Sequence, residues 1–264
     1  MNRRGSLFIV GTGILGTGQI TPDAEYWIRE ADRVFFLVQD PLSERWLKKA
    51  NPAARSLAHL YSTRRPRAKT YEMMVETMLA PLRRGATICG AFYGHPGVFA
   101  HPTHEAIRRA RAEGHRARML PGISAFDCLT ADLGLDPGRD GCHTYEATSF
   151  LLEAKKPDPT TALVLWQISV IGESRFRKRG FGKRNLEILA QRLADTYGAE
   201  HEVVIYEAAA LPGFEASVIR VPLNGLSSAK VSGLSTLYVP PLEEARMDQK
   251  MGRRLRLRWD ELLA

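Results

Sequence analysis

Residues 86–99 read Ala-Thr-Ile-Cys-Gly-Ala-Phe-Tyr-Gly-His-Pro-Gly-Val-Phe, an apolar run that passes directly into a loop with two glycines and one proline. A short apolar run bounded by turn residues is typical of a strand that is buried on both faces of a parallel sheet. Open α/β sheets bind ligands where their parallel strands end. The segment therefore predicts a buried strand at 86–92, followed at 93–99 by either a ligand-binding loop or a plain turn with packed aromatics.

The sequence before this segment alternates strands and helices. A helix is expected to begin at Thr21-Pro22, because threonine is a good N-cap and proline fits the first helical position. Other expected elements are strands at 6–10 and 34–38 and an amphipathic helix at 70–84. This βαβ order predicts a parallel sheet.

The sequence after this segment predicts a second, mixed α/β unit. Pro121-Gly122 forms a hinge, and Ser124 caps the helix that follows it. Expected elements are helices at 102–113 and 184–197, and strands at 116–120, 163–166, 202–206, 217–221 and 236–239. We therefore expect an α/β protein with domains at 1–122 and 123–242, a ligand cleft between them, and a charged, helix-prone tail at 243–264.

Composition is typical of a soluble, cytoplasmic protein with its own core. The chain has 264 residues, is 44% hydrophobic and carries a formal net charge of +8. Its three cysteines, Cys89, Cys128 and Cys142, suggest neither a disulfide framework nor a zinc site. No apolar run reaches the length of a signal sequence core or a membrane span.

Three other kinds of site were weighed. Gly11, Gly13 and Gly16 match a dinucleotide-binding loop with Asp40 on the ribose, but the helix begins too late to face a pyrophosphate. His95, His101 and His104 lack a carboxylate or cysteine that would complete a metal site. The basic clusters near residues 64–69, 175–184 and 253–258 interleave few aromatics beyond Phe176 and Phe181, so nucleic acid is not the expected partner.

Six motifs carry a specific resemblance over roughly residues 5–241. They are Val10-Gly-Thr-Gly13, Tyr93-Gly-His-Pro-Gly-Val-Phe99, Met119-Leu-Pro-Gly-Ile-Ser-Ala125, Ala131-Asp-Leu-Gly-Leu-Asp-Pro137, Thr144-Tyr-Glu-Ala147 and Ser235-Thr-Leu237. In this order and spacing they resemble the tetrapyrrole-methylase superfamily, and within it the borosin peptide α-N-methyltransferases. Porphyrin and corrin methylases tend to have Gly-Asp-Pro at the position of Gly94-His95-Pro96, so this chain resembles the peptide branch more.

The resemblance implies S-adenosyl-L-methionine as methyl donor, S-adenosyl-L-homocysteine as product, and no metal. The residues that it places at the donor are Tyr93, His95, Val98, Phe99, Ser124, Ala125, Gln167, Tyr206, Ala208 and Thr236.

It also places catalytic groups at Tyr61, Arg67, Tyr71 and Tyr93. A peptide nitrogen is a poor nucleophile because its lone pair is delocalised into the carbonyl group. The reaction therefore needs a base and a positive group. We expect Tyr71 to act as base or proton relay, Arg67 to stabilise the phenolate and imidate, and Tyr61 and Tyr93 to orient the peptide. Without the resemblance, Tyr71 and Arg67 would read as ordinary helix-surface residues.

Two features of the sequence differ from those of the borosin enzymes. Lys69 replaces an acidic residue that commonly precedes Thr-Tyr in the family. The charged residues 253–264 lack the Val/Ile-rich core peptide that mushroom members carry as a C-terminal extension. The expectation is thus a split borosin system: an enzyme homodimer that methylates a separate precursor, two per dimer. A tetrapyrrole or RNA methyltransferase of the same fold remains the alternative.

Overall fold

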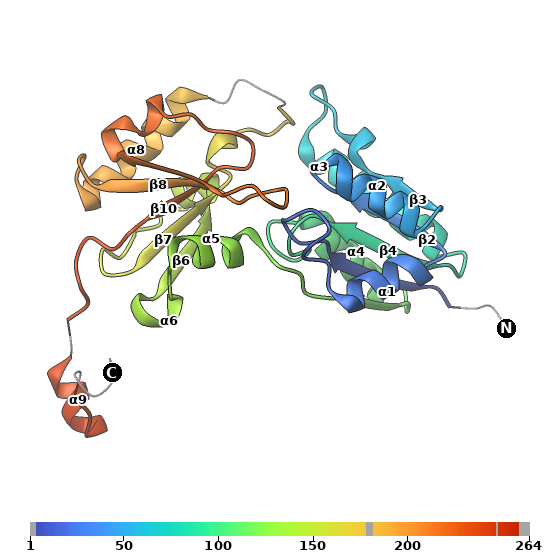
Figure 1. Cartoon of the computed structure of the whole chain (residues 1–264), viewed down its shortest axis with the longest axis horizontal. Helices are drawn as coiled ribbons and strands as arrows, with labels where there is room; N and C mark the ends of the chain where they lie inside the picture. The colour runs from blue at the N-terminus through green and yellow to red at the C-terminus, as the bar shows by residue number, and fades with distance from the viewer. Residues whose placement is uncertain (1–3, 178–181, 247, 259–264) are drawn as a thin grey trace.

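The computed structural model describes residues 4–177, 182–246 and 248–258, and it contains two five-stranded sheets flanked by helices (Figure 1). The first sheet has the strand order β3-β2-β4-β1-β5, and all its pairs are parallel. The second has the order β6-β7-β10-β8-β9, in which only β6 and β7 pair in parallel. The predicted α/β class, with a parallel sheet followed by a mixed one, is confirmed.

The N-terminal part is built on the first sheet. Its strands are β1 (Ser6–Gly11), β2 (Arg33–Leu37), β3 (Ala54–Ser56), β4 (Thr87–Phe92) and β5 (Arg116–Met119). Its helices are α1 (Pro22–Glu30), α2 (Pro41–Ala50), η1 (Ala58–Leu60), α3 (Arg67–Leu82) and α4 (His101–Ala112). Thr21 caps α1 as predicted, since its side chain accepts a hydrogen bond from the Ala24 N–H.

The C-terminal part is built on the second sheet. Its strands are β6 (Cys142–Glu146), β7 (Ala162–Trp166), β8 (Glu202–Glu207), β9 (Ser217–Pro222) and β10 (Thr236–Val239). Its helices are α5 (Ala125–Leu133), α6 (Pro137–Asp140), α7 (Ala147–Leu152), η2 (Ile168–Val170), α8 (Lys183–Tyr197), η3 (Leu223–Ser228) and α9 (Gln249–Leu255). The predicted boundary between residues 122 and 123 falls between β5 and α5, and as a domain boundary it stays a prediction.

The first sheet is buried on both faces, as its apolar strands require. One face packs Leu7 and Ile9 against α3 and α4, with Met74 and Met78 in the contact. The opposite face packs against α1 and α2, in a cluster that includes Phe36. The sheet is thus held between two helical layers, and its strand ends are free to carry loops.

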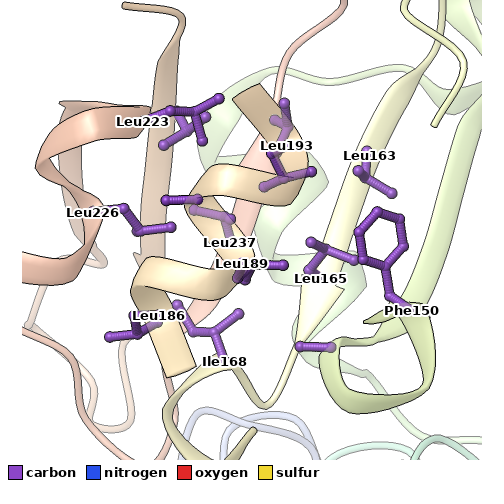
Figure 2. Packing of buried hydrophobic residues seen from close by; sticks show 14 of the residues in the cluster. Phe150, Leu163, Leu165, Ile168, Leu186, Leu189, Leu193, Leu223, Leu226 and Leu237 are labelled. Carbon is purple, nitrogen blue, oxygen red and sulfur yellow. The ribbon is translucent and has the colours of Figure 1, made fainter. Parts of the chain in front are cut away.

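The core of the C-terminal part forms around α8. Leu186, Leu189 and Leu193 lie on one face of this helix, at the i, i+3, i+7 spacing of an apolar stripe. They face Leu163 and Leu165 of β7, while η3 covers another side (Figure 2). This packing fixes β7, at whose end the predicted donor-binding residue Gln167 lies.

The predicted charged tail contains α9, which lies away from the rest of the structure (Figure 1). Residues 247 and 259–264 of the tail, Phe181 of the second basic cluster, and residues 1–3 fall outside the described residues. In the part of the chain that is described, no helix is both long and apolar enough to cross a membrane.

Candidate active site

Three glycine-containing loops meet at the carboxyl ends of β4, β1 and β5, three neighbouring strands of the first sheet. Gly11 ends β1, Gly94 follows β4, and Gly122 lies after β5. The loops pair across this point, since the Gly94 N–H donates to the Gly13 carbonyl at 2.9 Å. A Cβ atom on Gly11 would lie 2.4 Å from the Gly94 carbonyl oxygen and 2.9 Å from the Gly122 Cα atom. Glycine is therefore needed for the backbones to approach this closely.

A cavity of about 280 Å³ opens beside this junction, with walls from both sheets. The N-terminal part contributes Leu37, Gln39, Tyr61, Tyr71, Phe92, Tyr93, Val98, Phe99, Ala100 and Pro102. The C-terminal part contributes Ala125, Trp166, Gln167, Tyr206, Ala208, Gly233, Leu234, Ser235 and Thr236. The cavity is mostly apolar with a few polar groups, which is the usual make-up of a small-molecule site.

The loop between β4 and α4 is held by hydrogen bonds to one side chain of the loop itself and to two side chains at the start of α4. The Gly97 N–H donates to His95 Nδ1 at 2.9 Å, and His104 Nε2 lies 2.9 Å from the Gly97 carbonyl oxygen. Thr103 donates through Oγ1 to the Pro96 carbonyl. These contacts present Val98 to the cavity.

Two cavity residues have left-handed backbone conformations that non-glycine residues rarely adopt. The φ angle is +51° at Phe99 and +58° at Gln167. Such conformations cost on the order of 1–3 kcal/mol each and cluster at ligand sites. The ring of Phe99 lies 5.3 Å from the ring of Trp166, so the two strained positions adjoin across the cavity wall.

On the C-terminal side, two predicted residues are fixed by carboxylates. The buried Tyr206 donates its hydroxyl hydrogen to Asp132 Oδ2 at 2.6 Å, which leaves its ring to form the wall. Ser124 caps α5 in a capping box with Asp127. Ser124 therefore positions Ala125, which lines the cavity, and is itself buried outside it.

A second, more open hollow of about 510 Å³ adjoins the cavity and shares four residues with it: Tyr71, Phe99, Ala100 and Gln167. Arg67 lines this hollow, together with His101 and His104 on α4. Glu146 and Glu173 form part of its opposite wall. Tyr71 thus stands between the enclosed cavity and the hollow that carries the guanidinium group.

The phenols of Tyr61 and Tyr93 are held in their neutral form. Burial raises the pKa of Tyr61 to about 12, and the nearby Tyr71 adds to the shift while Arg67 opposes it. Burial likewise raises the pKa of Tyr93 to about 12, helped by Cys128 and Asp40. Both groups stay protonated at neutral pH, so they can donate hydrogen bonds but cannot accept a proton as bases.

The acid nearest to Tyr71 in sequence, Glu72, is already paired. Its two carboxylate oxygens each lie 2.6 Å from the guanidinium of Arg109 on α4. This hydrogen bonding lowers the pKa of Glu72. Glu72 therefore does not supply the acidic group that the family has at the position of Lys69, and Lys69 itself is exposed.

Most of the residues predicted from the sequence come together at this cavity. Those that line it are Tyr61, Tyr71, Tyr93, Val98, Phe99, Ala125, Gln167, Tyr206, Ala208 and Thr236. Arg67 lies in the adjoining hollow. His95 and Ser124 lie outside the cavity and support the segments that line it. Their roles in binding and catalysis stay predictions.

Sequence reasoning missed several apolar wall residues, among them Leu37, Phe92 and Trp166. All three end strands, at the carboxyl edge where such folds bind ligands, so position was an available signal. Asp40, weighed above as a ribose ligand, instead caps α2 by accepting the Ser43 N–H at 2.8 Å. Within residues 4–177, 182–246 and 248–258, no group of three or more His, Cys, Asp or Glu could hold a metal ion.

Comparison with known proteins gives a family and several relatives. The family model of the tetrapyrrole (corrin/porphyrin) methylases matches residues 6–226. A methyltransferase/ribosomally synthesized type III borosin cyclic peptide precursor of Anomoporia bombycina is 45% identical over 90% of this chain and 28% of its own length. The methyltransferase/omphalotin A precursor of Omphalotus olearius is 41% identical over 97% of this chain and 62% of its own. The chain thus spans between about a quarter and two thirds of the length of these relatives.

Solved structures share the fold at low identity. A uroporphyrin-III-C-methyltransferase from Thermus thermophilus superposes with a TM-score of 0.63 at 19% identity, covering 90% of this chain and 93% of that one. A diphthine synthase gives a TM-score of 0.61 at 16% identity, covering 94% of this chain and 95% of that one.

Proposed function

Because the chain belongs to the tetrapyrrole (corrin/porphyrin) methylase family, we propose that it transfers methyl groups from S-adenosylmethionine to backbone amide nitrogens of a ribosomally made peptide. S-Adenosylhomocysteine is the second product. The observation that carries the proposal is the position of Tyr71, which lines both the enclosed cavity and the open hollow with Arg67. The likeness to relatives named as methyltransferase/peptide precursors supports a peptide acceptor.

The cavity fits the donor in size and character. Its volume of about 280 Å³ and its aromatic walls, from Phe99, Trp166 and Tyr206, suit an adenosyl group. Phe99 and Gln167, the two residues with left-handed backbones, both line the cavity. When bound, the donor supplies an electrophilic methyl group on its sulfonium sulfur.

The acceptor peptide occupies the hollow, and its amide reaches the cavity past Tyr71. Tyr71, as base or proton relay, takes the amide proton while Arg67 stabilises the negative charge that develops on the carbonyl oxygen. The nitrogen then forms a bond to the methyl carbon as the carbon–sulfur bond breaks, and the sulfur keeps that electron pair. Tyr61 and Tyr93, which remain protonated, hold the peptide by donating hydrogen bonds.

The proposed assembly is a cytoplasmic homodimer that binds two separate precursor molecules. The relatives are named as methyltransferase and precursor in one protein. The acceptor is therefore tested in both forms, as a separate precursor encoded beside the gene and as any extension of the enzyme chain itself.

The test is intact-mass analysis of both the neighbouring precursor and the enzyme after incubation with S-adenosylmethionine. Mass steps of one methyl group each, located on backbone nitrogens by fragmentation, are expected. Tyr71→Phe and Arg67→Ala should slow these steps by roughly 100-fold or more, the scale of acid–base and oxyanion contributions. Tyr26→Phe, at a tyrosine 57% exposed on α1, is the matched control and should leave the rate unchanged.

Two other outcomes would contradict parts of this proposal. Donor binding without a mass step on any peptide would point to a tetrapyrrole or RNA acceptor instead. Methylation at full rate by Tyr71→Phe would show that Tyr71 does not take the amide proton.

A further inference from the structure

A segment of the C-terminal part reaches across to the start of α3. The N–H of Arg67 donates to the Ser174 carbonyl oxygen at 2.9 Å, and Pro66 forms an antiparallel bridge with Arg175. The next residue is Phe176, whose ring stacks on Tyr61 with the ring centroids 4.7 Å apart and the planes 27° from parallel. A backbone bridge and a ring stack thus join this segment to the start of α3 and to Tyr61.

The start of α3 depends on this contact for local chemical reasons. The first N–H groups of a helix have no partner within the helix and usually bond to an N-cap side chain. Here the N-cap is Pro66, which makes no side-chain cap hydrogen bond. The Ser174 carbonyl takes that place for the Arg67 N–H. The first turn of α3, which carries Arg67 and leads to Tyr71, is therefore fixed from outside its own unit.

The segment is itself anchored firmly at its beginning. Ile171 is buried in the core around α8, with 5% of its surface exposed. Asn185 of α8 donates through Nδ2 to the Ile171 carbonyl at 2.7 Å, and the Gly172 N–H donates to Thr148 Oγ1 at 3.1 Å. Residues 171–176, which we call the strap, thus connect the C-terminal core to the start of α3.

We infer that the strap positions Tyr61 and Arg67 for methyl transfer, and that Phe176 is a positioning residue of the reaction. The inference rests on the proposed function, because it concerns how those catalytic groups are held. Phe176 does not line the cavity, so its contribution passes through Tyr61. Removing the Phe176 ring should consequently lower the turnover number while leaving donor affinity nearly unchanged.

The decisive variant is Phe176→Ala, with Phe176→Tyr as the conservative replacement that keeps a stacking ring. Phe214→Ala, at a phenylalanine 70% exposed, is the matched control. Four quantities are compared. They are the dissociation constant for S-adenosylhomocysteine by calorimetry, kcat on the precursor, the KM for S-adenosylmethionine, and amide exchange of residues 61–72.

We expect Phe176→Ala to leave the S-adenosylhomocysteine dissociation constant and the KM within about twofold of wild type. Its kcat should fall by roughly 10- to 100-fold, as expected when catalytic groups are displaced by about an ångström. Exchange at residues 61–72 should become faster, and Phe176→Tyr should restore both quantities. If Phe176→Ala does not fold, Phe176→Leu, which keeps the volume without the ring, serves in its place.

An unchanged kcat in Phe176→Ala would overturn the inference, whatever happens to amide exchange. So would a loss of donor affinity that accounts for the whole loss of activity, because Phe176 would then act on the cavity. If the wild-type protein binds S-adenosylhomocysteine yet methylates no peptide, the proposed function fails separately. In that case amide exchange at residues 61–72 still tests the role of the strap. Exchange in Phe176→Ala that equals that of the wild type would overturn this role.

Discussion

At the residue scale, the neutral phenols of Tyr61 and Tyr93 lead to a prediction about stability at alkaline pH. Both have a pKa raised to about 12 in the folded protein, chiefly by burial, whereas an unfolded tyrosine ionises near 10. Below pH 10 both states keep the proton, so nothing is lost. Between about pH 10 and 12 the unfolded chain releases protons that the folded protein retains, and stability falls.

Each of these two partly buried tyrosines should therefore lower the unfolding free energy by about 1.4 kcal/mol at pH 11 relative to pH 9. Urea unfolding at the two pH values measures this loss. Tyr61→Phe and Tyr93→Phe should each recover about that amount, whereas Tyr26→Phe, whose phenol is largely exposed, should recover none. If all three variants lose equal unfolding free energy between pH 9 and pH 11, the phenols of Tyr61 and Tyr93 do not differ from exposed ones.

The polar residues of the site could be predicted from sequence motifs, but their positions could not. The motif around Tyr93 predicts a ligand loop, and the structure has Tyr93, Val98 and Phe99 at the cavity. The predicted role of His95 at the donor stays a prediction, and the structure adds that its Nδ1 accepts the Gly97 N–H. That bond depends on backbone geometry within the loop, which residue types alone do not reveal.

At the element scale, the glycine junction should tolerate no side chain. A Cβ on Gly11 would contact backbone atoms of two other loops, and backbone cannot move as a flexible side chain can. Gly11→Ala should lower the unfolding free energy by about 1–3 kcal/mol, the usual cost of overpacking. Because the displaced loops form the cavity, it should also weaken S-adenosylhomocysteine binding by roughly 10-fold or more, measured by calorimetry.

Gly225→Ala provides the control for this substitution. A Cβ at Gly225 meets nothing nearer than 3.6 Å, an ordinary contact with Pro222, so both stability and binding should stay close to wild type. If Gly11→Ala binds S-adenosylhomocysteine as tightly as Gly225→Ala does, the junction does not shape the cavity.

Strands with a continuous apolar run were predictable, whereas β3, β6 and α2 were not predicted. Strands β1, β4 and β7 are continuous apolar runs, and they lie within one or two residues of their expected bounds. Strand β6 reads Cys-His-Thr-Tyr-Glu and has no fully buried residue, so it carries no apolar signal. Helix α2 did have a signal, because Asp40-Pro41 repeats the cap and proline of Thr21-Pro22.

Helix α3 begins at Arg67, three residues before its expected start at residue 70. Local sequence could not predict this start, since Pro66 offers no side-chain cap and the Arg67 N–H finds its acceptor on Ser174. The position of Arg67 is thus decided by a residue more than a hundred positions away in the chain. Tertiary contacts of this kind override local propensity.

At the scale of the whole molecule, the two sheets depend on each other at the site. The cavity takes walls from both, and the strap extends from the C-terminal core to the first turn of α3. A ligand that fills the cavity therefore touches groups whose positions are set by both cores. Binding should stabilise the two parts together, even though each sheet has its own buried clusters.

This coupling can be measured with S-adenosylhomocysteine. At about 1,000 times its dissociation constant, a ligand of the native state adds roughly 4 kcal/mol of stability. Calorimetry should show one unfolding transition that moves upward as a unit, and amide exchange should slow in both β4 and β7. Gly11→Ala, which is expected to bind about 10-fold more weakly, should gain only about 2.7 kcal/mol at the same ligand concentration. Protection of only one of the two strands, with the other exchanging as in the free protein, would mean that the donor is held by one part alone, and a site shared between the sheets would then be wrong.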